Sequence, residues 1–428
     1  MSKLKNIWAN AELRTRLLMT ILLLVIFRLG CSVPVPYVAP TYLDSLFSSG
    51  NILSYMNVLS GNALSQCAMF ALGVGPYINA SIIIQLLTYA IPQLKDISKM
   101  ENGNKEIEKY TRMLTIVISA IMSLGYVHLL NINTALTTES FFARAILVVC
   151  FVAGSQACMF IGNMIDEIGI GNGISLLIFA GIIAGWGEIT NLITTVNIFA
   201  QFGYWWYYII GAGILLVTLL SLVYTVYVDG SFKKVPITYS TNTGSALPAN
   251  RNTHLPMKLI MTGVLPIIFA VTILQIPSTI AMVAGEKSKI YEVLSGFNEY
   301  SWLYMIIYAL LIFAFNYFYT SVQFNPTEVA NNLRTSGATI PGIRPGESTV
   351  TYLKKSVKKL TIAGSIALSA IAIVPLIVGR FTGLSVPFAG SSLLIVTGVA
   401  LECIEKINSY MTTRTSGSFL KRSKRRAR

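Results

Sequence analysis

The chain has 428 residues, of which 54% are hydrophobic and 12% are charged, and its formal net charge is +14. Soluble domains carry about 25% charged residues, whereas windows of roughly 20 residues without an ionisable group recur along this chain. The composition therefore excludes an ordinary soluble multidomain protein and indicates an all-α polytopic membrane protein.

Ten apolar stretches follow one another from the N-terminus, each long enough for a helix to cross a hydrocarbon core of about 30 Å. The expected spans are 15–36, 74–93, 111–130, 143–163, 173–192, 204–227, 257–283, 302–322, 360–379 and 387–407. The first run leads into VPVPYVAP rather than a small-residue cleavage site, so we interpret it as a retained span. Two sets of five spans would have opposite directions, which permits inverted halves with a pathway between them.

Basic residues are distributed unevenly between the two sides that ten spans would define. All but five of the 32 Lys and Arg fall on one side, and the exceptions are Arg28, Arg144, Lys287, Lys289 and Arg380. Because Lys and Arg accumulate in cytoplasmic loops, the bias predicts that both termini are cytoplasmic. The tail KRSKRRAR fits the same topology, although binding to anionic lipid, RNA or an acidic partner is an alternative role for it.

One apolar stretch between the first and second spans is interrupted. GNALSQCAMFALGVGPYINAS, residues 61–81, begins with an apolar run that would reach only about 15 Å as a helix. Gly73, Gly75 and Pro76 break this run, and a second apolar run, SIIIQLLTYAI, continues beyond them. We therefore expect a half-length helix, a break and then a full-length helix.

Residues suited to catalysis or metal binding are nearly absent from the spans. Arg28, Glu188, Glu402 and Glu405 lie near span ends, where long side chains reach the interface. The five cysteines show no metal or redox spacing, and we expect no metal and no cofactor. A proton-coupled carrier would normally carry an intramembrane carboxylate or histidine. An inverted-repeat secondary transporter of a small solute nevertheless stays the alternative function, and an intramembrane enzyme would need paired catalytic groups that we do not find.

The stretch GIGNGIS, residues 169–175, is only superficially similar to a phosphate-binding glycine loop. No strand precedes it, and it opens an apolar helix instead. We expect a tight turn in which the glycines and Asn172 reverse the chain.

Five long runs, in order along nearly the whole chain, resemble the SecY family, the central subunit of the bacterial protein-conducting channel. They are ALSQCAMFALGVGPYINASIIIQLLT, GIGNGISLLIFAGIIAG, NTHLPMKLIMTGVLPIIFA, FNPTEVANNLRTSGATIPGIRPG and GSSLLIVTGVALE. The resemblance implies ten helices in two pseudo-symmetric inverted halves around an hourglass pore, in the bacterial cytoplasmic membrane. It implies that the protein passes unfolded secretory polypeptides across this membrane and releases membrane-protein segments sideways into lipid, and that it is not an enzyme.

The span pattern and the resemblance together divide the chain into parts. These are the N-terminal half with spans one to five (1–192), the sixth span (193–228), a cytoplasmic loop (229–256), spans seven and eight (257–322), a cytoplasmic partner-binding loop (323–359), spans nine and ten (360–408) and a basic cytoplasmic tail (409–428). Both long loops are polar and contain Gly and Pro, and loops of this length are usually functional or disordered.

In the family, a short plug helix after the first span closes the resting pore, and a ring of aliphatic side chains forms the constriction. The matching plug helix would cover about 55–71, centred on Leu59, Ser60, Gly61, Asn62, Ala63, Leu64, Ser65, Gln66 and Cys67, with Gly73, Gly75 and Pro76 as its hinge. The matching ring is Val74, Ile78, Ile178, Ile268 and Ile395, although ordinary packing is the alternative role. A narrow apolar ring excludes ions by dewetting.

The resemblance also implies a lateral gate between the second and third spans and the seventh and eighth. Polar candidates for it are Asn79, Gln85, Thr88, Thr272 and Gln275, which alternatively hydrogen-bond within the bundle. Arg344 in PGIRPG matches an arginine that contacts the SecA motor or the ribosome in the family, and Lys354 and Lys355 follow it. Further implied partners are SecE-type and SecG-type small membrane subunits, the unfolded preprotein and membrane lipid.

The sequence departs from the family pattern in the loop between the sixth and seventh spans. The stretch KKVPITYSTNTGSALPANRNTHLP lacks the basic cluster that many bacterial relatives carry in its middle. An accessory SecY paralogue devoted to a few substrates therefore stays open as an interpretation.

Overall fold

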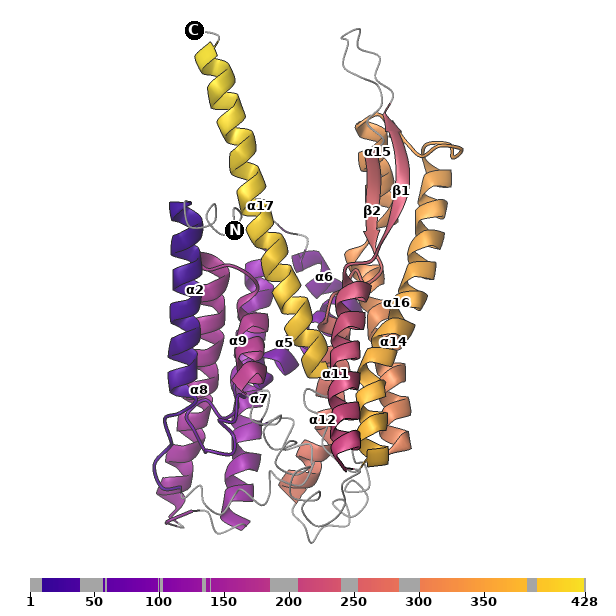
Figure 1. Ribbon diagram of the computed structural model, residues 1–428. Coiled ribbons are helices and arrows are strands. Elements are labelled where there is room, and N and C mark those ends of the chain that lie inside the picture. Colours follow the sequence, from indigo (N-terminus) through magenta and orange to yellow (C-terminus); the bar gives the residue numbers. More distant parts are fainter. Residues whose placement is uncertain are drawn as a thin grey trace. The chain divides into compact units, whose positions relative to one another are not determined.

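The computed structural model describes residues 10–38, 57, 60–98, 100, 103–132, 136–138, 140–184, 207–239, 253–284, 301–382 and 391–426 (Figure 1). The chain forms two compact units. The first contains Met1–Tyr208, Thr272–Ser301 and Ile395–Arg428, and the second contains Ile209–Val271 and Trp302–Leu394. Each unit is described by itself below.

The first unit is helical in its described part. Its helices are α2 (Ala11–Gly30), α5 (Gly75–Ala90), α6 (Pro92–Ser98), α7 (Gly103–Ile132), α8 (Phe141–Ile168) and α9 (Gly173–Ala184), with most of α17 (Ser391–Arg426). Helix α7 packs against α5 and α8, and α8 also packs against α2 and α9. A buried cluster fills the space between α7, α8 and the chain before α5, and it includes Leu64, Tyr126, Leu130, Leu147 and Phe151.

The second unit combines helices with a small sheet. Its elements are α11 (Tyr207–Asp229), β1 (Phe232–Tyr239), β2 (Thr253–Lys258), α12 (Leu265–Ala284, which continues beyond the unit), α14 (Trp302–Gln323), α15 (Pro326–Thr335), β3 (Ala338–Thr339) and α16 (Glu347–Thr382). The antiparallel sheet has the order β2-β1-β3, with Val235 paired to Leu255. Helix α14 packs against α16, and α15 packs against α16 and β3.

The sheet and two helices of the second unit share a core of their own. Val235 of β1, Met257 of β2, Ala330 of α15 and Leu353 of α16 are buried together, with Ile340 between β3 and α16. We call β1, β2, α15, β3 and the first part of α16 the loop module, because it occupies the two long loops expected from the sequence (Figure 1).

A helix lies at each of the ten ranges expected to be spans. Among the described residues, five helical stretches are long and apolar enough to cross a membrane by length and composition: Lys105–Asn131, Phe141–Ile168, Tyr208–Asp229, Trp302–Thr335 and Glu347–Thr382. Helix α9 and the Leu265–Leu274 part of α12 are shorter apolar helices. The membrane-protein class is therefore supported, and the count of ten crossings stays a prediction.

Two expectations about helix boundaries are wrong. Within the range expected for the plug helix, residues 60–71 form turns that continue to residue 74, whereas residue 57, the only other described position, is helical. The seventh span does not begin at 257, because β2 continues to Lys258 and turns follow until α12 begins at Leu265. In both places contacts with distant residues, described below, replace the helical hydrogen-bond ladder.

Candidate functional site

The segment of residues 60–74, which we call the turn segment, is tied to the chain that follows α2. Val35 donates its backbone N–H to the Cys67 carbonyl at 2.9 Å, and Met69 donates to the Val33 carbonyl at 2.8 Å. Within the segment, short turn bonds such as Cys67 to Leu64 at 3.1 Å replace a continuous helical ladder. Asn62 and Cys67 have positive φ angles of 65° and 47°, which a helix does not allow.

Side chains from two helices donate to carbonyls of the turn segment. The guanidinium of Arg28, in the last turn of α2, donates to the Gly61 carbonyl at 2.5 Å. The Tyr126 hydroxyl of α7 donates to the Leu64 carbonyl at 2.5 Å and lies 3.2 Å from the Cys67 sulfur. Since Tyr126 and Leu64 are both 2% exposed, this contact is inside the core of the first unit.

Glycines of α8 and α9 let the turn segment approach those helices closely. A Cβ placed on Gly154 of α8 would lie 1.9 Å from the Met69 carbonyl oxygen. A Cβ on Gly61 would lie 3.2 Å from the Cα of Gly181 in α9. The Phe70 ring stacks on Phe27 of α2 with centroids 6.0 Å apart. The segment is therefore enclosed by α2, α7, α8 and α9.

Burial also affects the thiol in the turn segment. It raises the pKa of Cys67 to about 11, and the hydrogen bond between Cys67 and Tyr126 lowers it by a smaller amount. A group with this pKa is almost entirely protonated at neutral pH, and the protonated thiol is a poor nucleophile. Because Cys67 is also only 1% exposed, we expect it to react slowly with alkylating reagents.

The break after the turn segment lies where the sequence predicts it. Gly73 has a φ of 51°, Val74 caps the helix, and α5 begins at Gly75 with Pro76 in its first turn. Proline is well accommodated there, because the first N–H groups of a helix have no partner within the helix. The hinge function of these residues stays a prediction. Of the expected plug residues, Leu59 lies outside the described part of the chain.

The aliphatic residues expected in the constriction occupy different elements. Val74 and Ile78 lie one turn apart at the start of α5, and Ile78 donates its N–H to the Val74 carbonyl at 3.1 Å. Ile178 is buried in α9, and Ile395 is buried near the start of α17. Ile268 of α12 belongs to the second unit, so the closure of the ring stays a prediction.

The polar residues of α5 that are expected at a lateral gate form hydrogen bonds within α5 or with the neighbouring helix α7. Gln85 donates to the Ser81 hydroxyl at 3.0 Å, and Thr88 donates to the Ile84 carbonyl at 2.8 Å, all within α5. Asn79 donates to the Met122 sulfur of α7 at 3.8 Å. Thr272 is half-buried on α12, and the side chain of Gln275 lies outside the described part. Gate membership stays a prediction.

The glycine-containing stretch 169–175 is a turn, as the sequence predicts. Asn172 accepts a hydrogen bond from the Ser175 N–H at 3.1 Å, and Asp166 accepts from the Gly173 N–H at 2.8 Å. Lys406 of α17 donates to the Gly171 carbonyl at 2.9 Å. A Cβ on Gly173 would lie 1.9 Å from the Gly162 carbonyl oxygen, so this glycine serves helix packing.

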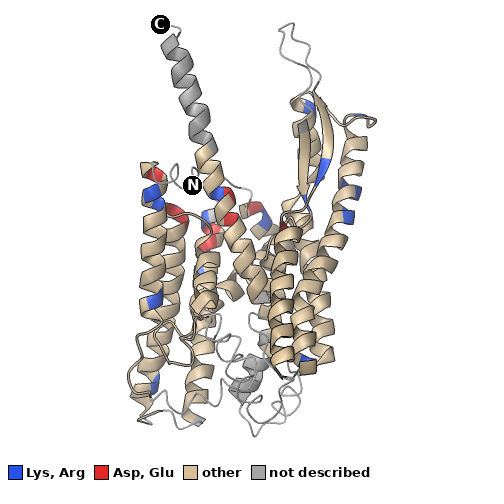
Figure 2. Cartoon of the chain, in the orientation of Figure 1, with Lys and Arg blue, Asp and Glu red and all other residues tan. Residues whose placement is uncertain are grey.

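Three of the five basic residues that break the charge bias have specific contacts. Arg28 donates to Gly61, Arg144 donates to the Asn131 side chain at 3.2 Å, and the Arg380 guanidinium lies 5.2 Å from the Trp302 ring centroid. Lys287 and Lys289 lie outside the described residues. Figure 2 shows that, within each unit, most of the other described charged residues lie toward one end of the helices.

The loop module presents the basic residues expected to bind partners. Arg344 is exposed in a tight turn between β3 and α16, flanked by Gly342 and Gly346 with φ angles of 80° and 105°. Its carbonyl accepts a hydrogen bond from the Thr349 hydroxyl at 3.0 Å, which fixes the turn to α16. Lys354 and Lys355 are exposed on the first turns of α16.

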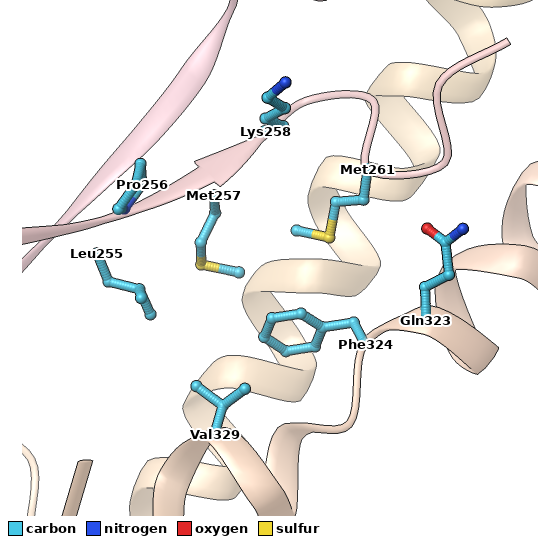
Figure 3. Close-up of a pocket in the computed structure, with 8 residues that line it drawn as sticks. All are labelled: Leu255, Pro256, Met257, Lys258, Met261, Gln323, Phe324 and Val329. Atoms are coloured by element: carbon cyan, nitrogen blue, oxygen red, sulfur yellow. The ribbon is translucent and has the colours of Figure 1, made fainter. Parts of the chain in front are cut away.

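A pocket of about 280 Å³ lies at the base of the loop module. Figure 3 shows the side chains of Met257, Met261 and Phe324 directed toward one another, whereas the Lys258 amine points away. The complete lining is Leu255, Pro256, Met257, Lys258, Met261, Gln323, Phe324 and Val329. Methionine side chains adapt to differently shaped apolar groups, so the lining suits an apolar group.

The helices, the enclosed turn segment and the basic loop module define a polytopic α-helical membrane protein. The SecY family model matches residues 68–404. The protein translocase subunit SecY of Bacillus subtilis is 35% identical over 427 residues, which cover 98% of this chain and 99% of that protein. The same subunit of Pseudomonas aeruginosa is 35% identical over 430 residues, covering 96% and 94%. The chain belongs to the SecY family.

Solved structures show the same fold. One, described as the structure of a protein conducting channel, has a TM-score of 0.68 at 16% identity and covers 92% of both chains. Sec61 in the canine ribosome-channel complex has a TM-score of 0.65 at 15% identity and covers 92% of both. A third structure concerns the plug domain of SecY, with a TM-score of 0.67 at 17% identity.

Proposed function

We propose that this chain is the channel-forming subunit of a protein translocase, which passes unfolded secretory polypeptides across a bacterial cytoplasmic membrane and releases apolar segments sideways into lipid. The main support for this proposal is the 35% identity to a SecY subunit over nearly the whole of both chains. The fold similarity to protein-conducting channels agrees with it. The relatives are channel subunits, and we propose that this chain likewise performs no catalytic step of its own.

The aliphatic residues Val74, Ile78, Ile178, Ile268 and Ile395 would form the constriction. Narrow apolar rings exclude water and ions when no chain is present. Dispersion contacts with such side chains are individually weak and non-directional, so a moving polypeptide can pass without being held. The turn segment would close the resting pore in the role of a plug. This proposal is supported by the enclosure of the segment, which ends at Val74, and by the position of Ile78 one helical turn further along α5.

The direction of movement requires energy from a partner. We propose that Arg344, Lys354 and Lys355 contact a SecA-type motor or the ribosome, and that SecE-type and SecG-type subunits complete the channel. The exposed position of the three side chains supports this role. The guanidinium group binds acidic or phosphate groups through several donors at once. A related channel has been solved in a ribosome-channel complex.

Reconstitution tests the proposed function. The chain would be placed in lipid vesicles with its SecE-type and SecG-type subunits, and an unfolded secretory precursor would be added with SecA and ATP. We expect protease protection of the precursor that depends on ATP. A control reaction contains vesicles with the small subunits alone. Absence of protection, together with uptake of a small solute by the same vesicles, would favour a secondary transporter instead.

A further inference from the structure

The turn segment depends on bonds from outside itself more than a helix would. An isolated helix carries a continuous ladder of internal bonds, whereas residues 60–74 form separate short turns. Their conformation must therefore be fixed by neighbouring elements. Among the described residues, three side-chain donors from outside the segment reach its carbonyls: the Cys31 thiol to Ser60 at 3.6 Å, and the stronger donors Arg28 and Tyr126, which come from different helices far apart in the sequence.

Arg28 occupies a position that is unfavourable for a cation unless it has a partner. It lies in the last turn of an apolar helix, at the membrane side that is expected to carry only five of the 32 Lys and Arg residues. Its hydrogen bond to the Gly61 carbonyl requires a residue without a side chain at position 61. A Cβ at Gly61 would lie 2.9 Å from the Arg28 Nη1 atom, and Gly61 has a φ of 69°. A side chain at position 61 would therefore displace the guanidinium.

Tyr126 is held in place independently of its hydroxyl group. Its ring packs edge-on against Phe151 of α8, with centroids 5.1 Å apart, and the whole side chain is buried. A change of Tyr126 to Phe therefore keeps the ring and removes only the bonds to the Leu64 carbonyl and the Cys67 sulfur. The Leu64 carbonyl would then keep only the backbone N–H of Cys67 as a donor, at 3.1 Å, so the hydroxyl supplies a second buried hydrogen bond that favours the enclosed position of the segment.

We propose that Arg28 and Tyr126 are positioning residues that hold the turn segment in the closed channel and set how readily it is displaced. This inference rests on the proposed function, in which displacement of the segment opens the pore. The two donors act on carbonyls three residues apart, at Gly61 and Leu64. Loss of either bond favours the displaced state without removing any residue of the constriction.

The reporter for displacement is Cys67, which is buried beside Tyr126 in the closed state. Vesicles with the complete channel complex would be treated with a maleimide, and labelling at each native cysteine would be quantified by mass spectrometry. Cys158 of α8 is also fully buried and serves as an internal reference for loosening of the helices. The resting ion conductance of the same vesicles provides a second readout.

We expect Tyr126→Phe and Arg28→Gln each to increase the rate of Cys67 labelling roughly fivefold, as expected for one lost buried hydrogen bond. The resting ion conductance would also rise in both variants. Arg28→Lys retains a cationic donor and would recover part of the effect. The matched controls are Tyr110→Phe, on the exposed start of α7, and Arg144→Gln, whose partner is Asn131. These controls would leave Cys67 labelling unchanged.

Unchanged Cys67 labelling and conductance in both variants would overturn the inference, and so would an equal rise at Cys158. Precursor translocation by the unmodified complex is measured in parallel. Normal translocation with unaffected variants would refute the positioning role alone. A complex that transports no precursor would refute the proposed function, whereas the labelling data would still report whether the two residues hold the segment.

Discussion

Asn316 of α14 donates through its side-chain amide to the hydroxyl of Ser365 of α16 at 2.8 Å, and both side chains are buried. The same amide group donates to the Thr361 carbonyl at 3.2 Å and accepts from the Thr262 hydroxyl at 2.8 Å. Thr262 lies in the turns between β2 and α12. Asn316 therefore connects the base of the loop module to two helices of the second unit.

Replacing Asn316 by alanine is expected to destabilise the second unit. The change leaves the Thr262 hydroxyl without its acceptor and the Thr361 carbonyl without this donor, a loss of about 1–2 kcal/mol. Thermal unfolding of the purified complex in detergent measures the effect. Asn331→Ala, on the exposed face of α15, is the matched control. Equal thermal midpoints for the two variants would contradict the structural importance of the network.

Replacing Gly173 by alanine is expected to force α8 and α9 apart. The new Cβ would lie 1.9 Å from the Gly162 carbonyl oxygen, and overpacking of this kind costs about 1–3 kcal/mol. Gly213→Ala is the control, because a Cβ there meets no atom within 4 Å. The control would be neutral or slightly stabilising, since alanine favours the helix. The prediction fails if both variants unfold at the same temperature.

Polar substitutions in the proposed constriction are expected to increase the resting ion leak. Asparagine at Ile78 or Ile178 would make the narrow region easier to hydrate, which removes the dewetting barrier. Conductance of vesicles containing the complex measures the leak. Ile83→Asn and Ile183→Asn, at exposed positions of the same two helices, are the controls. If the leak is equal in all four variants, Ile78 and Ile178 do not line the constriction.

Reversing the charge at Arg344 is expected to reduce SecA-dependent translocation at least tenfold, the factor for about 1.4 kcal/mol of lost binding. The Arg344 side chain is exposed, and its turn is fixed by the bond from the Thr349 hydroxyl to the Arg344 backbone carbonyl, so Arg344→Glu should leave thermal stability unchanged. Arg344→Lys keeps the charge but not the multiple donors, and we expect an intermediate rate. Lys105→Glu, on the exposed start of α7, provides the control. Full activity of Arg344→Glu would exclude this residue from partner binding.

Alkylation of Cys67 in the unmodified complex is expected to depend on pH up to an unusually high value. The thiolate is the reactive form, and burial raises the pKa of this thiol to about 11. The labelling rate should therefore increase about tenfold for each pH unit and level off only near that pKa. The same chain in denaturant is the control, with a plateau near a pKa of about 8.5. An early plateau in the folded complex would show that Cys67 is accessible at rest.

Hydropathy was sufficient to locate the helices, because an apolar helix must be long and uncharged wherever it lies in a membrane. It was less informative outside the expected spans. Helix α16 begins at Glu347, well before the expected span at 360, because its first turns are polar and basic. In β1, Val235 and Ile237 alternate with exposed neighbours, a period-two signal that was available but short.

The conformation of the turn segment could not be predicted from its own residues. An apolar composition suits both a short helix and a buried chain of turns. Which of the two conformations forms depends on the hydrogen bonds from Arg28 and Tyr126. The sequence does not indicate that these side chains contact Gly61 and Leu64. The break at Gly73 and Pro76 was predictable, since these residues act locally. The resemblance supplied the candidate constriction, because aliphatic residues have no distinguishing pattern in an apolar helix.

The separate core of the loop module has a consequence for how such proteins diversify. Val235, Met257, Ala330 and Leu353 pack with one another, so the exposed basic residues stand on a scaffold that is stabilised locally. Surface changes there can accumulate over evolution without re-optimising the transmembrane packing. Related proteins can therefore differ in the partners that the loop module binds while the helices stay the same. Residues 232–258 and 326–357 should be exchanged together when chimaeras are made.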